Sequence, residues 1–259
     1  MYQAPSYVWA AILLATIGIP LLAVVALYRG ALAARMPRRT ATGVAVVAAS
    51  LLGGWFVVTS LLASSGTYAR TIAPAVELPV LTVAAVGTLA ALLLATTIPV
   101  VSRSLSAPGS LARLALAQTP RVEGFVFLIV LAQGALPAGF AWPAAVGDMA
   151  TGLAAPFVAR QLTRGSGRRL AVWFNVFGLV DLINAVTLGV LFGLGVFAVE
   201  PAPQALAFLP LALVPTLAVP VAITLHVVSL RRLLAGARGK DQDTSMTIPT
   251  GEPTTMHPA

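Results

Sequence analysis

The sequence predicts an all-α protein: a polytopic integral membrane bundle of seven transmembrane helices, with its N-terminus outside and its C-terminus in the cytoplasm. Two observations support this prediction. The chain contains seven long apolar runs, and fifteen of its sixteen basic residues fall in alternate gaps between them, Arg70 being the exception. Because cytoplasmic loops collect Lys and Arg, the alternation predicts both the number of crossings and their direction.

The composition agrees with a lipid environment. Of the 259 residues, 58% are hydrophobic and 9% are charged, with a mean hydropathy of +0.93, whereas about a quarter of an ordinary soluble domain is charged. The net charge of +8 comes from residues at loop ends, where anionic headgroups attract them. We therefore expect the lipid bilayer, and no nucleic acid, as a partner.

The apolar runs have roughly the length of 18 to 25 residues that is needed to cross the hydrocarbon core. No basic residue precedes the first run, so we interpret it as a signal anchor and not as a cleavable signal peptide. The sequence predicts spans at residues 7–28, 41–63, 79–101, 123–141, 143–159, 170–199 and 205–230. Residues 1–234 then form one transmembrane domain.

Two segments outside these spans have a recognisable character. Residues 110–118 are predicted to form a short helix on the inner membrane surface, with Leu111, Leu114 and Leu116 facing lipid and Arg113 facing headgroups. Residues 235–259 are rich in Thr, Pro, Asp and Gly, a composition that cannot bury enough apolar surface to fold. We expect a disordered cytoplasmic tail there.

Polar residues inside the predicted spans are concentrated in the last four helices. They are Gln133, Asp148, Asn175, Asp181, Asn184 and His226. An ionised carboxylate near the bilayer centre costs at least a few kcal/mol, so such a group is paired, protonated or placed in a wet cavity. Asp148 and Asp181 are therefore the principal candidates for a functional site.

Helix geometry predicts which of these groups meet. At about 1.5 Å per residue, Asp148 and Asn184 lie at similar depths, roughly 8 Å below the outer surface, and Asp181 lies near the midplane with Gln133. At about 100° per residue, Asp181 and Asn184 share one face of the sixth helix. The sequence therefore predicts Asn184 as the partner of Asp148.

Asn175 and His226 form a second predicted pair. Both lie roughly 8 Å above the inner surface, and Asn175 points about 180° away from Asn184. These depths leave His226 about 7 Å or more from Asp181, too far for a direct hydrogen bond. A single intramembrane histidine and the absence of cysteine argue against haem and zinc, and we expect no metal and no cofactor.

Glycines and prolines give a further signal. Four glycines border the two aspartates: Gly147, Gly152, Gly178 and Gly189. They are either sites of close helix approach or the ordinary glycine content of membrane helices. Pro210, Pro215 and Pro220 predict that the seventh helix is bent or broken, because each proline removes a backbone hydrogen bond.

Two interpretations of the aspartates remain open. They are a protonatable or cation-binding site, or they hydrogen-bond neighbouring helices together. The first favours a non-enzymatic, proton-linked carrier or channel-like protein of a bacterial-type cytoplasmic membrane, with an unidentified small solute or lipid as ligand. Asp181 would be the protonation site and Asp148 an outer gate or second site, with Asn184 beside them and Gln133, Asn175 and His226 as secondary candidates.

Other functions are weaker or excluded. An intramembrane hydrolase or transferase acting on lipid would use Asp148 and Asp181 as acid and base, with His226 assisting. An accessory membrane subunit would also suit the small extramembrane mass. A retinal protein is excluded because the single lysine, Lys240, lies in the tail, so no Schiff base can form within the bundle.

Overall fold

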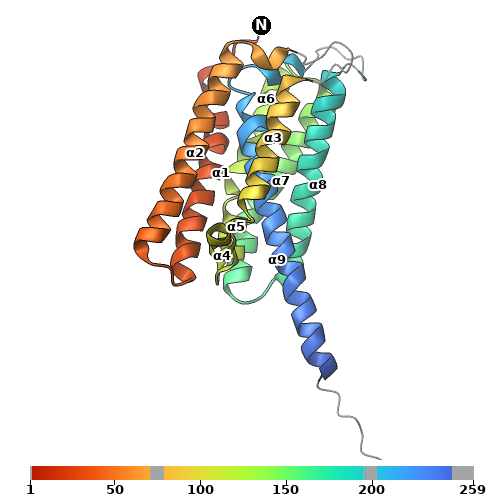
Figure 1. Ribbon diagram of the computed structural model, residues 1–259. Coiled ribbons are helices and arrows are strands. Elements are labelled where there is room, and N and C mark those ends of the chain that lie inside the picture. Colours follow the sequence, from red (N-terminus) through yellow and green to blue (C-terminus); the bar gives the residue numbers. More distant parts are fainter. Residues whose placement is uncertain (1, 71–78, 195, 197–202, 247–259) are drawn as a thin grey trace, which may run out of the picture.

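The computed structural model is a helical bundle (Figure 1). It describes residues 2–70, 79–194, 196 and 203–246, with side chains up to residue 235, and no strand occurs among these residues. Five segments are long and apolar enough to cross a membrane: Ser6–Ala33, Arg38–Ser64, Ser110–Ala132, Arg168–Phe192 and Val214–Ala235. A sixth is obtained if α3 (Val80–Ala95) and α4 (Pro99–Ser106), bent by 81°, form one broken span.

The first helices follow the predicted runs. Helices α1 (Ser6–Ala33) and α2 (Arg38–Ser64) enclose the predicted spans 7–28 and 41–63, and the short 3-10 helix η1 (Thr67–Ala69) follows them. The predicted span 79–101 is α3, which ends at Ala95. Its predicted end belongs to α4, which leaves the axis of α3 at the 81° bend.

The segment predicted as a surface helix lies inside the bundle, so that prediction was wrong. Helix α5 (Ser110–Leu116), the 3-10 helix η2 (Thr119–Phe125) and α6 (Val126–Ala132) together make up the apolar segment Ser110–Ala132. Leu114 is buried while Leu116 is exposed, so the leucines do not share one lipid face. Ala112 and Ala115 are buried instead, because small side chains allow close contact with neighbouring helices.

The boundary between the next two helices also differs from the prediction. The break falls before α7 (Ala138–Thr163) and not at residue 142. Gly134 has a left-handed φ of 69°, and Pro137 directly precedes the helix, so both residues stop the chain from continuing as one helix. Helix α7 is similar in length to α1, α2 and α8. Its hydropathy is lowered by Asp148 and two internal prolines, and it is not one of the five segments named above.

The last two helices confirm the expectation of a proline-broken segment. Helix α8 (Arg168–Gly193) covers most of the predicted span 170–199, whose end lies outside the described residues. The chain then forms the short helix η3 (Pro203–Ala207), the π-helical turn η4 (Val214–Ala218) and α9 (Val219–Met246). Helix α9 thus extends beyond residue 235, where the disordered tail was predicted to begin, and residues 247–259 lie outside the described part.

The broken region provides a hydrogen-bond partner for Trp55, which lies in the middle of α2. Pro220 has no N–H, so the carbonyl of Thr216, four residues earlier, lacks its usual helical donor. The Trp55 indole Nε1 donates to that carbonyl at 2.9 Å. A residue of α2 therefore satisfies a backbone group that the proline leaves free.

The two ends of the bundle differ in charge. The α1–α2 and α7–α8 connections and the end of α9 lie at one end, opposite the N-terminus (Figure 1). Arg168 donates to the carbonyl of Leu233, and Arg232 donates to the carbonyl of Ser106 at 2.6 Å. These bonds join the end of α4 and the start of α8 to the middle of α9. The arginines of the two connections, such as Arg35 and Arg164, make this the basic end of the bundle.

Candidate functional site

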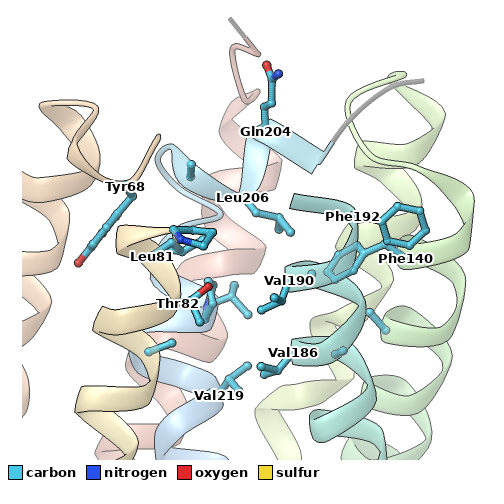
Figure 2. A pocket seen from close by; sticks show the side chains of 18 of the residues that line it. Tyr68, Leu81, Thr82, Phe140, Val186, Val190, Phe192, Gln204, Leu206 and Val219 are labelled. Atoms are coloured by element: carbon cyan, nitrogen blue, oxygen red, sulfur yellow. The ribbon is translucent and has the colours of Figure 1, made fainter. Parts of the chain in front are cut away.

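A cavity of about 590 Å³ lies between α3, α8 and the η3–η4 segment. Figure 2 shows Val186 and Val190 of α8 pointing toward α3, with Gln204 at the upper end and Val219 near the lower end. The walls are mainly aliphatic and aromatic, and the charged residues among the described lining residues are Arg70 and Asp148. The cavity is thus an apolar chamber with one carboxylate in its lining.

Tyr68 contributes an apolar surface to this cavity because its hydroxyl is engaged elsewhere. The Tyr68 and Thr59 hydroxyls are 2.6 Å apart. Thr59 donates its only hydroxyl proton to Thr216 at 2.8 Å, and Thr216 donates to the carbonyl of Ala212 at 2.6 Å. Tyr68 must therefore donate to Thr59, and burial raises the pKa of the Tyr68 phenol, which keeps that proton in place.

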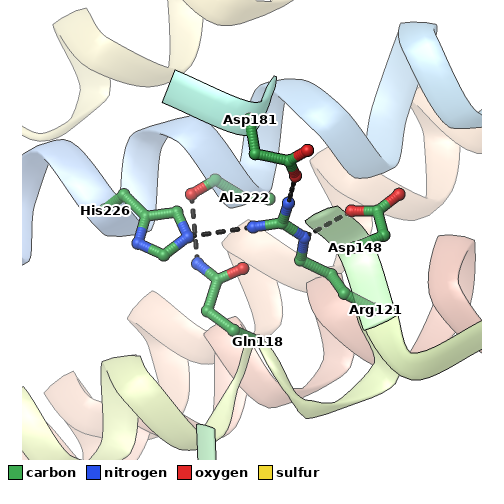
Figure 3. Close-up of polar contacts among 6 residues, drawn as sticks. All are labelled: Gln118, Arg121, Asp148, Asp181, Ala222 and His226. Carbon is green, nitrogen blue, oxygen red and sulfur yellow. Dashed lines mark hydrogen bonds and ion pairs between the residues drawn. The ribbon is translucent and has the colours of Figure 1, made fainter. Parts of the chain in front are cut away.

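The carboxylate at the cavity belongs to a charged cluster centred on Arg121 (Figure 3). The Arg121 side chain is 2% exposed, and its Nε donates to Asp148 Oδ1 at 2.6 Å. Its Nη2 donates to Asp181 Oδ2 at 2.5 Å, and its Nη1 lies 3.0 Å from His226 Nε2. One guanidinium thereby connects η2, α7, α8 and α9.

The same contacts determine the tautomer of His226. A guanidinium can only donate hydrogen bonds, so His226 Nε2 is an acceptor. The ring proton is then on Nδ1, which donates to Asn175 Oδ1 at 2.9 Å, and Asn175 Nδ2 donates to the carbonyl of Ala171 at 2.7 Å. A continuous hydrogen-bonded chain therefore runs from Asp148 toward the basic end of α8.

Glycines make room for the charged and polar side chains. A Cβ added at Gly147 would lie 1.6 Å from Asp181 Oδ1, and one added at Gly178 would lie 2.4 Å from His226 Nε2. Real Cβ atoms do not come this close to other atoms. The interpretation of Gly147 and Gly178 as sites of close approach is thus confirmed.

The remaining glycines divide into two groups. A Cβ at Gly152 would lie 2.2 Å from the backbone nitrogen of Val122, so Gly152 also allows a close approach, here between α7 and η2. Gly124 allows a close approach to Asp148, because a Cβ added at Gly124 would lie 2.4 Å from the Asp148 Cβ. Gly124 was not among the four glycines that the sequence indicated. A Cβ at Gly189 would make only ordinary contact, 3.7 Å from the Phe140 ring.

The cluster contains more negative than positive charge. With both aspartates ionised and His226 neutral, Arg121 leaves one carboxylate charge uncompensated. A buried charge of this kind is normally paired or neutralised by a proton. Glu123 is a further buried carboxyl, and its Oε2 has no hydrogen-bond partner among the described residues.

The structure unites some predicted residues and separates others. Asp148, Asp181 and His226 meet on Arg121, and Asn175 contacts His226 as predicted. Arg121 was missed because the charge pattern placed it in a cytoplasmic loop. Its signal was the charge balance: two aspartates lay inside predicted spans without a cation, and Arg121 lay two residues outside the fourth span.

Two predicted residues lie away from the cluster. Asn184 is exposed on α8, so its predicted pairing with Asp148 was wrong. Side chains three residues apart on a helix differ in direction by about 60°. Asp181 is therefore buried in the bundle while Asn184, on the same helix, is exposed. Gln133, at the end of α6, accepts from Tyr2 at 2.5 Å and donates to Tyr7 at 2.8 Å, so it belongs to the N-terminal end of the bundle and not to the Asp181 level.

Comparison with known proteins places this cluster within a family. Residues 78–234, more than half of the chain, match the model of a family described as a domain of unknown function (DUF8737). The chain belongs to this family. The DUF8737 region begins just before α3 and ends within α9, so it contains Arg121, both aspartates and His226, while α1 and α2 precede it. No curated protein and no solved structure matches the chain.

Proposed function

We propose that the protein is a proton-linked carrier or channel-like protein for a small solute, in which Asp148 exchanges a proton with the cavity. One observation carries this proposal: the cavity is lined by Asp148, one of two carboxylates that share the single guanidinium of Arg121. Arg121 compensates one negative charge. The second carboxylate needs a proton or another cation in a low-dielectric environment.

The geometry favours Asp148 over Asp181 as the exchanging group. The Asp148 side chain is 15% exposed and lines the cavity, whereas that of Asp181 is 7% exposed and is absent from the described lining. Asp181 is then the lasting counter-ion of Arg121. This assignment reverses the roles that the sequence suggested.

Proton exchange at Asp148 can change the packing of the bundle. A protonated Asp148 loses its charge attraction to Arg121, so the link between η2 and α7 weakens while Asp181 retains its bond. A local change of charge of this kind can bias two arrangements of packed helices. Helix α3 is the element that we expect to move, because it forms one wall of the cavity and contains no buried residue.

We further propose that α7 also crosses the membrane and so completes a set of seven crossings, with the N-terminus outside and the C-terminus in the cytoplasm of a bacterial-type membrane. The alternation of basic residues supports this topology. A reporter fused after Leu234 should be active in the cytoplasm, and one inserted near Ser65 should be active outside. The opposite result at either site would contradict it.

The enzymatic alternative has less support from the geometry. His226 is 1% exposed, and both of its ring nitrogens are engaged, by Arg121 and by Asn175. It is also absent from the described residues that line the cavity. A general base needs direct access to the proton that it removes, so we retain the carrier as the proposed function.

Proton titration of the purified protein tests the proposal without knowledge of the solute. Protons bound per chain are measured from about pH 5 to about pH 9 in a weakly buffered lipid nanodisc suspension. Asp148→Asn should bind about one proton fewer than the wild type, because the carboxyl that exchanges is gone. Asn184→Ala, on the exposed face of α8, is the control and should match the wild type. Equal proton binding by Asp148→Asn and the wild type would overturn the proposal.

A further inference from the structure

We propose that the cavity ligand is a monovalent organic cation with an apolar body, which replaces the proton at Asp148. This inference rests on the proposed function and names the class of solute. The cavity offers apolar walls, including the rings of Phe127, Phe140, Phe192 and Phe208, together with the carboxylate of Asp148. Aromatic rings attract cations through their faces, so both features select the same kind of ligand.

Asp148 has a free acceptor for such a ligand. Its Oδ1 accepts from Arg121, while its Oδ2 has no hydrogen-bond partner among the described residues. A cationic headgroup at Oδ2 would leave the contact with Arg121 intact. The apolar part of the ligand would then extend between α3 and α8.

The surrounding positive charges do not favour an anion at the same place. Each of the three Arg121 nitrogens already makes a hydrogen bond within the cluster, and Arg121 is buried and absent from the described lining of the cavity. Arg70 is the other charged lining residue, but it is exposed and lies at the end of η1. An anion that reached Asp148 would meet a carboxylate without a free cationic partner.

Charge balance links this ligand to the proton. When the neighbouring buried Glu123 carboxyl is neutral, the cluster of Arg121, Asp148 and Asp181 has one negative charge too many, and either one proton or one monovalent cation removes it. Both cannot be held at once without leaving a positive charge in an apolar site, which is unfavourable. Binding of the cation therefore releases the proton, and this competition is sufficient for exchange of one for the other.

The cavity is large enough for such a molecule. Its volume of about 590 Å³ lies in the range of about 300–1,000 Å³ that small-molecule sites occupy. One wall is α3, whose residues are all at least partly exposed. A lipophilic cation that is dissolved in the membrane would therefore have only one helix to displace.

Three derivatives that share the adamantyl body and differ in the charge of their polar group test the charge of the ligand. Trimethyl(1-adamantyl)ammonium is permanently cationic, 1-adamantanol is neutral and 1-adamantanecarboxylate is anionic. Binding to the full-length protein in nanodiscs is measured by calorimetry, and proton release by a pH indicator in weak buffer. The cation should bind at least about tenfold more tightly than the alcohol. It should release about one proton per molecule bound. The carboxylate should show no binding. Equal binding of the alcohol or the carboxylate, or binding of the cation without proton release, would overturn the inference.

Two tryptophan variants on α8 show whether binding occurs in the cavity. Val186→Trp places an indole inside the cavity and should strongly weaken binding of the ammonium compound, whereas Val180→Trp lies on the exposed face and should leave it unchanged. Unchanged binding in a folded, monodisperse Val186→Trp protein would place the ligand elsewhere and contradict the inference. If the ammonium compound fails to bind while Asp148→Asn still binds one proton fewer, the ligand class is wrong and the proton-linked function stands. If Asp148→Asn leaves proton binding unchanged, the proposed function itself fails.

Discussion

Helices α3 and α7 both line the cavity, yet they are packed in opposite ways. Helix α7 carries Asp148 and buries much of its length against its neighbours, and a Cβ at Gly147 would collide with Asp181. Helix α3 is wholly apolar apart from two threonines, has no buried residue, and its Gly87 has no atom within 4 Å of an added Cβ. In this bundle the most apolar helix is at the periphery, and the helix with polar and small residues is at the centre.

The difference has a physical cause. Lipid tails are as apolar as leucine, so an apolar helix gains little by leaving the lipid, whereas polar groups and glycines gain hydrogen bonds and close contacts inside the bundle. The Arg121 cluster therefore holds α7, α8, α9 and η2 together. Helix α3 contributes no residue to this cluster.

The largest effect should come from removing the central cation. Arg121→Met leaves two buried carboxylates without a partner, and we expect it to lower the free energy of unfolding by about 3–5 kcal/mol. Denaturation in mixed detergent micelles measures this loss. Adding Asp148→Asn and Asp181→Asn to the variant should restore much of the stability, because no charge then remains. A fully stable single variant would show that the cluster does not hold the centre together.

A pair of alanine substitutions compares the two helices directly. Gly147→Ala should destabilise the protein by about 1–3 kcal/mol, because the new methyl group overlaps Asp181. Gly87→Ala on α3 should be neutral or slightly stabilising, since alanine is the better helix former and the site is open. Thermal unfolding of both variants provides the measurement. Similar losses at the two sites would remove the contrast between α3 and α7.

Double-mutant cycles sharpen the boundary of the cluster. The losses from Asp148→Ala and Arg121→Ala should be strongly non-additive, since the two side chains are in contact. The losses from Asp148→Ala and Asn184→Ala should add within about 0.5 kcal/mol, because Asn184 faces away. Coupling between Asp148 and Asn184 in the unfolding free energy would contradict this placement of Asn184.

The smallest effect is expected at the broken segment before α9. Trp55→Phe removes the donor to the Thr216 carbonyl and should cost about 1 kcal/mol, as for a typical hydrogen bond. Pro220→Ala restores a backbone donor for the same carbonyl, so Trp55→Phe should cost less in that background. Equal costs of Trp55→Phe in both backgrounds, measured by thermal unfolding, would show that the indole does not replace the missing bond.

Much of the architecture could be predicted from local patterns. Run length located α1, α2 and α8, and the prolines predicted the break before α9. The segment from residue 110 was misread because its alanines and leucines fit an amphipathic surface helix as well as a packed one. Which of the two occurs depends on α7, whose glycines are distant in sequence.

The site was predictable in its acids but not in its cation. Asp148, Asp181 and His226 were apparent because polar groups are rare in apolar runs. Arg121 was assigned to a cytoplasmic loop by the positive-inside rule. That rule does not distinguish a loop residue from a basic residue at the edge of a span. Only the packing of η2 against α7, close enough for a Gly152 Cβ to overlap Val122, places its guanidinium between the two aspartates.

Infrared spectroscopy of the carboxyl groups tests the central claim most directly, because it observes the proton on the acid itself. The claim is that Asp148 holds an exchangeable proton beside Arg121. The wild type in lipid should show a protonated-carboxyl absorption that decreases as the pH rises. In Asp148→Asn this absorption should be smaller by the contribution of one carboxyl, with the buried Glu123 remaining, and in Asn184→Ala it should be unchanged. A pH-dependent absorption of the same size in Asp148→Asn and the wild type would contradict the account.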